Sequence, residues 1–260
     1  RSIDPLAAVI DNIFTSNTEG RQGLSELHLA VGDMDNDGTR DEIAVAFREG
    51  SNDSVQLLVL TPANVPLSGS GANMILNMRL VDFKRPGAGA PQRLALAMGD
   101  LNGDYRDELI YAQEQQNNNS PGVSSGIATR AFSFDPTNTQ LVEYLSRNES
   151  LATSQLALAA GDTDRDGRDE LVRAYRIFGD DSGLVVETFD AEQGQMVVRH
   201  NHYRESSGPR VSFDMLSLDV GDMDRDGFED IVAGMRDADK QLNLVRLEDS
   251  ELPMAGISLG

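Results

Sequence analysis

Short apolar runs with period two alternate along the chain with loops that are rich in Asp, Gly, Asn and Pro. Alternation of this kind, with many Val, Ile and Leu residues, is typical of β-strands rather than helices. Turn-forming residues fill the tracts 61–73 and 113–126, which are predicted to be loops. The predicted strands are 27–31, 43–47, 55–60, 74–83, 94–98, 108–112, 127–134, 141–145, 156–160, 171–177, 184–190, 196–203, 215–220, 230–235 and 242–247.

One acidic stretch, which first reads LAVGDMDNDGTRDEIAVAF, is written four times. Its copies are 29–47, 96–112, 158–174 and 218–234. Their first aspartates are 67, 62 and 60 residues apart, which indicates a repeat architecture with about four strands per repeat. We therefore expect a single repeat domain over 1–260, in which residues 3–14 of an N-terminal segment, 1–24, could complete the last sheet. The repeats are expected at about 25–90, 91–152, 153–212 and 213–260.

The chemistry of each copy suits a hard cation. Three or four carboxylates crowd into one tight loop, where they repel one another. Side-chain oxygens at the first, third and fifth positions, a backbone carbonyl at the seventh and a carboxylate at the ninth are ligands that Ca²⁺ takes. Glycine at the sixth position, such as Gly38, allows a left-handed turn. Four copies in one register favour metal loops over solvated acidic turns.

Other metal sites fit this stretch poorly. An EF-hand loop needs a bidentate Glu at its twelfth position and a helix on each side. The twelfth residues here are Ala44, Tyr111, Arg173 and Ala233, and the flanking segments have the period of strands. The chain has no Cys and no His inside these loops, so zinc and copper lack their preferred ligands. We therefore predict about four Ca²⁺ ions.

The strand before the second loop is apolar on both faces. Leu94, Leu96 and Met98 face one way, and the small residues Ala95 and Ala97 face the other. Such a strand suits sheets that are stacked face to face, as in the inner strand of a propeller blade. The prediction is an all-β fold, a β-propeller-like array of four-stranded antiparallel blades with the calcium loop between the first and second strands of each blade.

The pattern Gly-Asp-x-[Asp/Asn]-x-Asp-Gly-x-x-[Asp/Glu] before an apolar strand resembles the FG-GAP, or VCBS-like, repeats of integrin α-chain β-propellers and bacterial surface proteins. The resemblance covers all four copies. The side-chain metal ligands that it implies are Asp33, Asp35, Asp37 and Asp41; Asp100, Asn102, Asp104 and Glu108; Asp162, Asp164, Asp166 and Glu170; and Asp222, Asp224, Asp226 and Asp230. The backbone carbonyls that it implies come from Thr39, Arg106, Arg168 and Phe228.

The chain departs from this pattern in several places. Tyr105 stands where Gly is expected, so it must hold a strained backbone or the second loop must bind more weakly. The first loop is one residue longer, so Glu42 could replace or join Asp41. Asp107 or Asp169 could compete with the neighbouring Glu. Family propellers usually have more blades than the four seen here, so the chain either closes as a four-bladed ring or forms an arc of a larger propeller. We favour the closed ring or a self-contained array.

The net charge of the chain limits the classes of partner that it is expected to bind. Lys and Arg number 22 and Asp and Glu 43, which gives a net charge of −21. This acidity repels nucleic acid and anionic membrane surfaces, so neither is an expected partner. No apolar run approaches a membrane span. Calcium loops of modest affinity favour an extracellular or cell-surface location, where the ion is abundant.

Catalysis has little support in the sequence. Gly-x-Ser-x-Gly, the phosphate loop and His-Glu-x-x-His are absent, so we predict that the chain is not an enzyme. His200 and His202 share one side of a strand and could bind a metal or act as a base, but surface histidines usually do neither. His28 is expected to be a packed residue. The loop arginines expected to balance carboxylates are Arg106, Arg168 and Arg225.

The resemblance implies a calcium-stabilised module that works by binding, adhesion or scaffolding, with structural calcium. Its partner would be a protein or glycan at the cell surface, or like copies in an assembly. A polysaccharide-acting enzyme or its accessory domain is the alternative, although the chain has no Trp and only 5% aromatic residues for stacking on sugars. A structural spacer in a surface or filament assembly is a third hypothesis.

Overall fold

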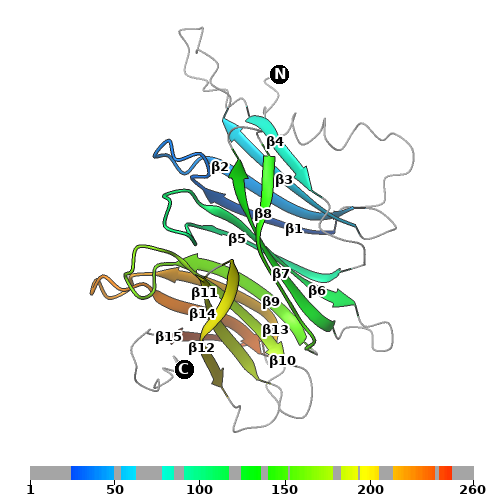
Figure 1. Cartoon of the computed structure of the whole chain (residues 1–260). Coiled ribbons are helices and arrows are strands. Elements are labelled where there is room, and N and C mark those ends of the chain that lie inside the picture. Colours follow the sequence, from blue (N-terminus) through cyan, green and yellow to red (C-terminus); the bar gives the residue numbers. More distant parts are fainter. Residues whose placement is uncertain are drawn as a thin grey trace, which may run out of the picture.

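The computed structural model describes residues 25–49, 54–62, 78–84, 91–116, 124–135, 140–151, 153–177, 183–192, 194–204, 213–237 and 240–247. These residues form an all-β fold of four antiparallel sheets (Figure 1). Within each sheet, consecutive strands pair in chain order as a meander. The described ranges contain no helix, and hence none long and apolar enough to cross a membrane.

The four sheets follow the four repeats. The first contains β1 (Ser25–Gly32), β2 (Glu42–Glu49), β3 (Ser54–Pro62) and β4 (Met78–Lys84). The second contains β5 (Pro91–Gly99), β6 (Glu108–Gln116), β7 (Ser124–Asp135) and β8 (Gln140–Glu149). The third contains β9 (Thr153–Gly161), β10 (Glu170–Ile177), β11 (Leu184–Glu192) and β12 (Gln195–Arg204). The fourth contains β13 (Phe213–Gly221), β14 (Asp230–Asp237) and β15 (Leu242–Leu247).

Each strand predicted from the sequence is present. The predicted loop over 113–126 is wrong at both ends, because β6 continues to Gln116 and β7 begins at Ser124. Gln115 pairs with Gly126 across this hairpin, so the backbone ladder extends into polar sequence that carries no apolar alternation. Residues 3–14, expected to complete the last sheet, lie outside the described residues, as does most of the loop predicted after β3.

The sheets stack on one another through their first strands. In Figure 1, β1, β5, β9 and β13 run side by side through the middle of the molecule. Leu94 and Met98 of β5 pack with residues of the first sheet, whereas Ala95 and Ala97 pack with residues of the third. The predicted burial of both faces of this strand is therefore confirmed.

The described strands do not show the closed four-bladed ring, which was one of the two arrangements that the sequence favoured. Leu27 of β1 is 61% exposed and Met215 of β13 is 54% exposed, on the two outer faces of the stack. The outer first strands β1 and β13 are thus exposed at opposite ends of the stack, although Val45 and Phe47 of β2, on the same face as Leu27, are only 7% and 1% exposed.

Glycine at the end of the first strand permits the close approach of neighbouring sheets. A Cβ atom added to Gly99 would lie 2.5 Å from the Cβ atom of Ala160 and 2.6 Å from Oδ2 of Asp169, both in the third repeat. No described atom lies within 4 Å of the corresponding position on Gly221, at the end of β13. At the junctions between two sheets, a larger residue at this position would therefore clash with the following repeat.

Polar side chains are also buried between the second and third sheets. Glu114 of β6 is fully buried, accepts a hydrogen bond from Oγ1 of Thr153 (3.1 Å) and pairs with Arg93 (3.3 Å). Burial raises the pKa of the Glu114 carboxyl, since desolvation outweighs the nearby guanidinium. Arg173 of β10, also fully buried, donates to Oγ1 of Thr129 on β7 (3.0 Å). These contacts tie two sheets together through polar groups.

Replacing Gly99 by Ala is expected to lower the free energy of unfolding by about 1–3 kcal/mol, because the methyl group overpacks the junction with Ala160. Gly221→Ala is the matched control and is expected to change it by less than about 0.5 kcal/mol. Urea denaturation in dilute solution measures both. Equal loss of stability in the two variants would contradict the close approach at Gly99.

Glu114 predicts a pH dependence of stability. Its pKa in the folded chain lies above the ordinary value of 4.5, so the folded state keeps this proton after the unfolded state has released it. The stability contributed by this group is fully present below that value and is lost as the pH rises through the folded pKa. As the pH rises above about 4.5, the melting temperature of Glu114→Gln is therefore expected to fall less than that of the parent protein, at one fixed Ca²⁺ concentration. An equal fall in melting temperature with pH in the two proteins would contradict this prediction.

Candidate metal centres

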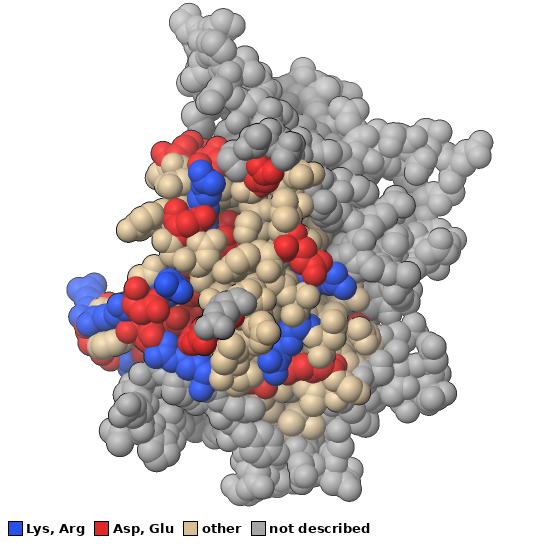
Figure 2. All heavy atoms as spheres, viewed as in Figure 1, with Lys and Arg blue, Asp and Glu red and all other residues tan. Residues whose placement is uncertain are grey.

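Each acidic loop joins the first and second strands of its sheet. The loops are 33–41, 100–107, 162–169 and 222–229. All four project from the left side of the stack in Figure 1. Figure 2 shows Asp and Glu side chains gathered along the same side. The repeat therefore presents its acidic loops as a row along one edge of the stacked sheets.

Two residues of each loop have a left-handed backbone. At the sixth position it is glycine in three loops and Tyr105, with φ 66°, in the second, which confirms the strained backbone predicted there. At the fourth position, which the sequence analysis did not single out, these residues are Asn36, Gly103, Arg165 and Arg225. The second loop thus carries its glycine at the fourth position and a bulky residue at the sixth, the reverse of the other three.

A repeated set of hydrogen bonds holds the loop closed. The carboxylate of Asp33 accepts from the backbone N–H groups of Asp37 (3.2 Å) and Gly38 (2.9 Å). The carboxylate of Asp37 accepts from the N–H of Thr39 (2.9 Å). The same bonds recur in the third loop. They orient carboxylates that still have lone pairs available for a cation.

The loops bring carboxylates together in three places. Within each group, one carboxylate oxygen from every residue lies within 4.8 Å of the others. The groups are Asp33, Asp35 and Asp37; Asp162, Asp164, Asp166 and Glu170; and Asp222, Asp224 and Asp226. Oxygens that bind Ca²⁺ at about 2.3–2.6 Å lie at most about 5 Å apart, so the spacing and the all-oxygen donor set fit this ion. The predicted carboxylate ligands that do not join such a group are Asp41, Asp230, Asp100, Asp104 and Glu108.

The first residue of each second strand is an acid that is hydrogen-bonded to the backbone of the loop before it. Its carboxylate accepts a hydrogen bond of 2.8–3.1 Å from the N–H of the second loop residue. These acids are Glu42, Glu108, Glu170 and Asp230. In the first loop this residue is Glu42, and Asp41 precedes it. The structure therefore places Glu42, the alternative ninth-position ligand, where Glu170 lies in the third loop.

Burial and like charge raise the pKa values of several of these acids. Burial, together with the charge of Asp104, raises the pKa of Glu108 to about 8. Burial, with Asp164 nearby, raises the pKa of Glu170 to about 7. The pKa of Asp35 in the first loop is also raised by burial and by neighbouring aspartates. A bound cation would offset this repulsion and favour the ionised carboxylates.

Two arginines from outer strands reach the third and fourth loops. The Arg199 guanidinium, on β12, contacts Asp164 and lies 4.0 Å from Glu170. The Arg246 guanidinium, on β15, lies 2.5 Å from the third-position carboxylate of the fourth loop and 2.8 Å from Asp230. Figure 2 shows basic side chains among the acidic ones at this lower part of the row. A guanidinium thus neutralises the predicted ligands in two loops, and a metal ion would compete with it.

One acid of each later loop binds the preceding loop instead of its own. Oδ2 of Asp107 accepts from the N–H of Asp33 (3.0 Å), and the Asp107 N–H donates to the Asp33 carbonyl (2.8 Å). Asp169 makes the same two bonds to Asp100, at 2.9 and 2.8 Å. Glu229 is bonded in the same way to the N–H of the first residue of the third loop. The prediction that Asp107 or Asp169 competes with the neighbouring Glu is therefore wrong, because these acids cap the neighbouring repeat.

These capping acids form a second charged group, which the sequence analysis missed. Arg40 of the first loop lies 2.9 Å from Oδ2 of Asp107. Burial, together with the charges of Asp107 and Glu229, raises the pKa of Asp169 to about 6. The available signal was the recurrence of an acid directly before the second strand, at Asp107, Asp169 and Glu229.

The remaining candidates take other places. Among the described residues, ion pairs to loop carboxylates come from Arg40, Arg199 and Arg246, whereas Arg106, Arg168 and Arg225 were expected to supply them. The Arg168 side chain lies instead against the second loop, 3.2 Å from the Cβ position of its glycine. The predicted carbonyl donors Thr39, Arg106, Arg168 and Phe228 follow the turn of each loop, and their role stays a prediction.

The histidines lie on strands. Burial lowers the pKa of His28 on β1, as expected for a packed residue. His200 and His202 of β12 pair with Thr188 and Val186 of β11 in the ladder. A role for these two residues stays untested.

No protein-family model and no curated protein matches the chain. Its function is therefore inferred from the geometry of the loops and sheets.

Replacing Arg199 by Met is expected to raise the Ca²⁺ affinity of the third loop about two- to fivefold, because the carboxylates lose a partly exposed internal counter-ion. The calcium-free variant should also melt at a lower temperature than the calcium-free parent protein. Isothermal titration calorimetry and melting curves measure the two effects. Arg130→Met removes a surface pair with Glu143 (2.8 Å) outside the loops and is the matched control. A lower Ca²⁺ affinity in Arg199→Met would show that the guanidinium does not compete with the ion.

Proposed function

We propose that the acidic loops bind Ca²⁺ and that the bound ions stabilise the stacked sheets. The observation that carries this proposal is the third loop, where Asp162, Asp164, Asp166 and Glu170 converge within 4.8 Å. All four donors are carboxylates, the ligand type that Ca²⁺ prefers. The raised pKa of Glu170, about 7, reflects burial and repulsion that a divalent ion would offset. The first and fourth loops repeat this arrangement with three carboxylates each.

In the second loop the proposed ligand set is weaker. Asn102 replaces one carboxylate, and its Nδ2 donates to Glu108 (2.7 Å). Glu108 also accepts from Oγ of Ser133 (3.3 Å). These bonds occupy groups that would bind the ion, so we propose that this loop is the last to fill as the Ca²⁺ concentration rises.

We propose further that the sheets are blades of a β-propeller-like array, as the FG-GAP-like motif implies. Three features support this arrangement: the four meanders, the first strands packed on one another, and the loops on one edge. The Arg40 guanidinium interacts electrostatically with Asp107, Asp169 and Glu229, which belong to three different repeats. These shared charges support an arrangement in which the loops approach a common centre, as around a propeller axis.

The biochemical role that we propose is binding or scaffolding outside the cell, with calcium in a structural part. Loops on a rigid frame are where such modules contact partners. The net charge of −21 disfavours nucleic acid and anionic membranes, which leaves proteins and glycans as partners. No catalytic role is proposed for any residue.

Calcium is expected to raise the melting temperature of the chain by roughly 10 °C over the protein in a chelator. Each site at ten times its Kd contributes about 1.4 kcal/mol, and three sites act together. Glu170→Gln should lose about a third of the shift. Glu143→Gln, which changes an acid outside the loops, should keep all of it.

An unchanged melting temperature on chelation would contradict the calcium proposal. The calcium-loaded and chelated forms, applied to arrays of glycans and cell-surface proteins, test the binding role separately. Binding that requires calcium would support it, and the absence of any binding by the loaded form would count against it.

A further inference from the structure

The three junctions in the stack share one plan. Each sheet has a backward face, which packs on the preceding sheet, and a forward face, which packs on the following sheet. A row of apolar residues on the first strand lies on the backward face, and in β13 this row is Leu216, Leu218 and Val220. The preceding sheet supplies small residues and a terminal glycine, and its loop backbone is capped by the following repeat. Each sheet therefore carries both halves of one interface.

The first sheet exposes an unused backward row. Leu27, Leu29 and Val31 of β1 have the same residue types, at the same register, as the row in β13. These side chains are 61%, 61% and 51% exposed. Asp41, directly before β2, holds the chain position from which Asp107 caps the preceding loop. The row and the acid are the first-strand and loop part of the surface that later sheets use to bind the sheet before them, whereas Val45 and Phe47 on the same face of β2 are already buried.

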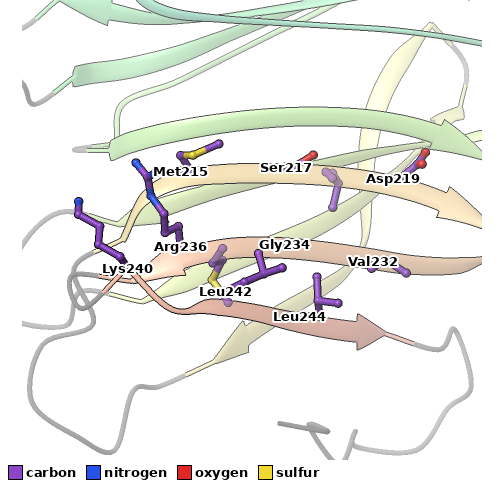
Figure 3. Close-up of a pocket in the computed structure, with 11 residues that line it drawn as sticks. Met215, Ser217, Asp219, Val232, Gly234, Arg236, Lys240, Leu242 and Leu244 are labelled. Carbon is purple, nitrogen blue, oxygen red and sulfur yellow. The ribbon is translucent and has the colours of Figure 1, made fainter. Parts of the chain in front are cut away.

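The fourth sheet exposes the matching forward face. Figure 3 shows Met215 and Ser217 of β13 and Leu242 and Leu244 of β15 on either side of β14. These residues line a hollow of about 340 Å³. The two leucines are 67% and 40% exposed. Gly221 meets no described atom within 4 Å at the place where Gly99 and Gly161 meet the following repeat. This face is the half of the interface that earlier sheets use to receive the next sheet.

We propose that the forward face of the fourth sheet binds the first sheet of a second copy of this chain, so that the chains associate head to tail. The backward row of β1 in one copy would fill the hollow on the fourth sheet of the other copy. Asp41 would then cap the backbone of Asp222, as Asp107 caps Asp33. The contact continues an interface that is already built three times within one chain, between different surfaces of identical molecules.

The proposal does not require that the loops bind calcium, because the contact is made by the apolar row of β1 and by a hollow outside the loops, whose apolar lining includes the charged residues Asp219, Arg236 and Lys240. The net charge of −21 on each copy opposes association, so the contact should strengthen when salt screens that charge. Failure of calcium binding would therefore leave the head-to-tail contact testable, and failure of association would leave the calcium proposal intact.

Sedimentation velocity and light scattering of the full chain at moderate salt test the association. The expected result is a mass of two or more chains that increases with concentration. Leu29→Glu places a carboxylate in the backward row, and Leu244→Glu places one in the forward face. Each variant should weaken association at least about tenfold, because the contact would bury an unpaired carboxylate. Val142→Glu, at a side chain that is 45% exposed on β8, is the matched control and should associate like the parent protein.

A mixture of the two variants separates this contact from a symmetric one. Each variant keeps the half that the other has lost, so the mixture should form a dimer although neither variant does alone. Circular dichroism confirms that both variants keep the fold. A parent chain that is monomeric at all concentrations, or a mixture that stays monomeric, would overturn the proposal.

A disulfide test distinguishes a second copy from closure within one chain. The sequence has no Cys, so Leu29→Cys with Ser217→Cys supplies the only thiols. Oxidation should produce disulfide-linked dimers and longer ladders. A disulfide that forms only within single chains would show that the two ends meet each other in one molecule, and the proposal would then be wrong.

Discussion

Carboxylates held within a few ångströms of one another are the constraint on which the rest of this structure depends. The third loop alone gathers four of them, and burial with like charge raises the pKa of Glu170 to about 7. Unbalanced, this repulsion would open the loop and separate the strands that it joins. The structure balances it in two loops with the guanidinium groups of Arg199 and Arg246, and the donor geometry fits a divalent ion as the stronger counter-charge.

The same short stretch also governs how the sheets pack. The carboxylates at the first, third and fifth positions lie within their own loop. The acid directly before the second strand instead accepts a hydrogen bond from the backbone of the preceding loop, as Asp169 does from Asp100. A glycine at the end of the first strand allows that approach, since a Cβ atom on Gly99 would clash with the next repeat. One motif therefore builds both the proposed metal site and the junction between sheets, so an ion bound in a loop would also act on the stacking.

Much of this arrangement follows from the sequence, because period-two strands and a repeated acidic loop are local patterns. The left-handed backbone at Tyr105 follows as well, since its position in the loop demands it. The roles of Asp107, Arg199 and Arg246 do not follow, because each contacts a residue on another strand or in another repeat, and only the stacked fold brings the partners together. For the same reason, the sequence left open whether the four sheets close into a ring.

A crystal structure of the chain grown in saturating Ca²⁺ is the most direct test of the central claim that the acidic loops bind divalent ions. The account predicts an ion in the first, third and fourth loops, with carboxylate oxygens about 2.3–2.6 Å from it. Arg199 and Arg246 should then have withdrawn from the carboxylates that they contact in the structure described above. Loops that hold no ion, with both guanidinium groups still in place, would contradict the account.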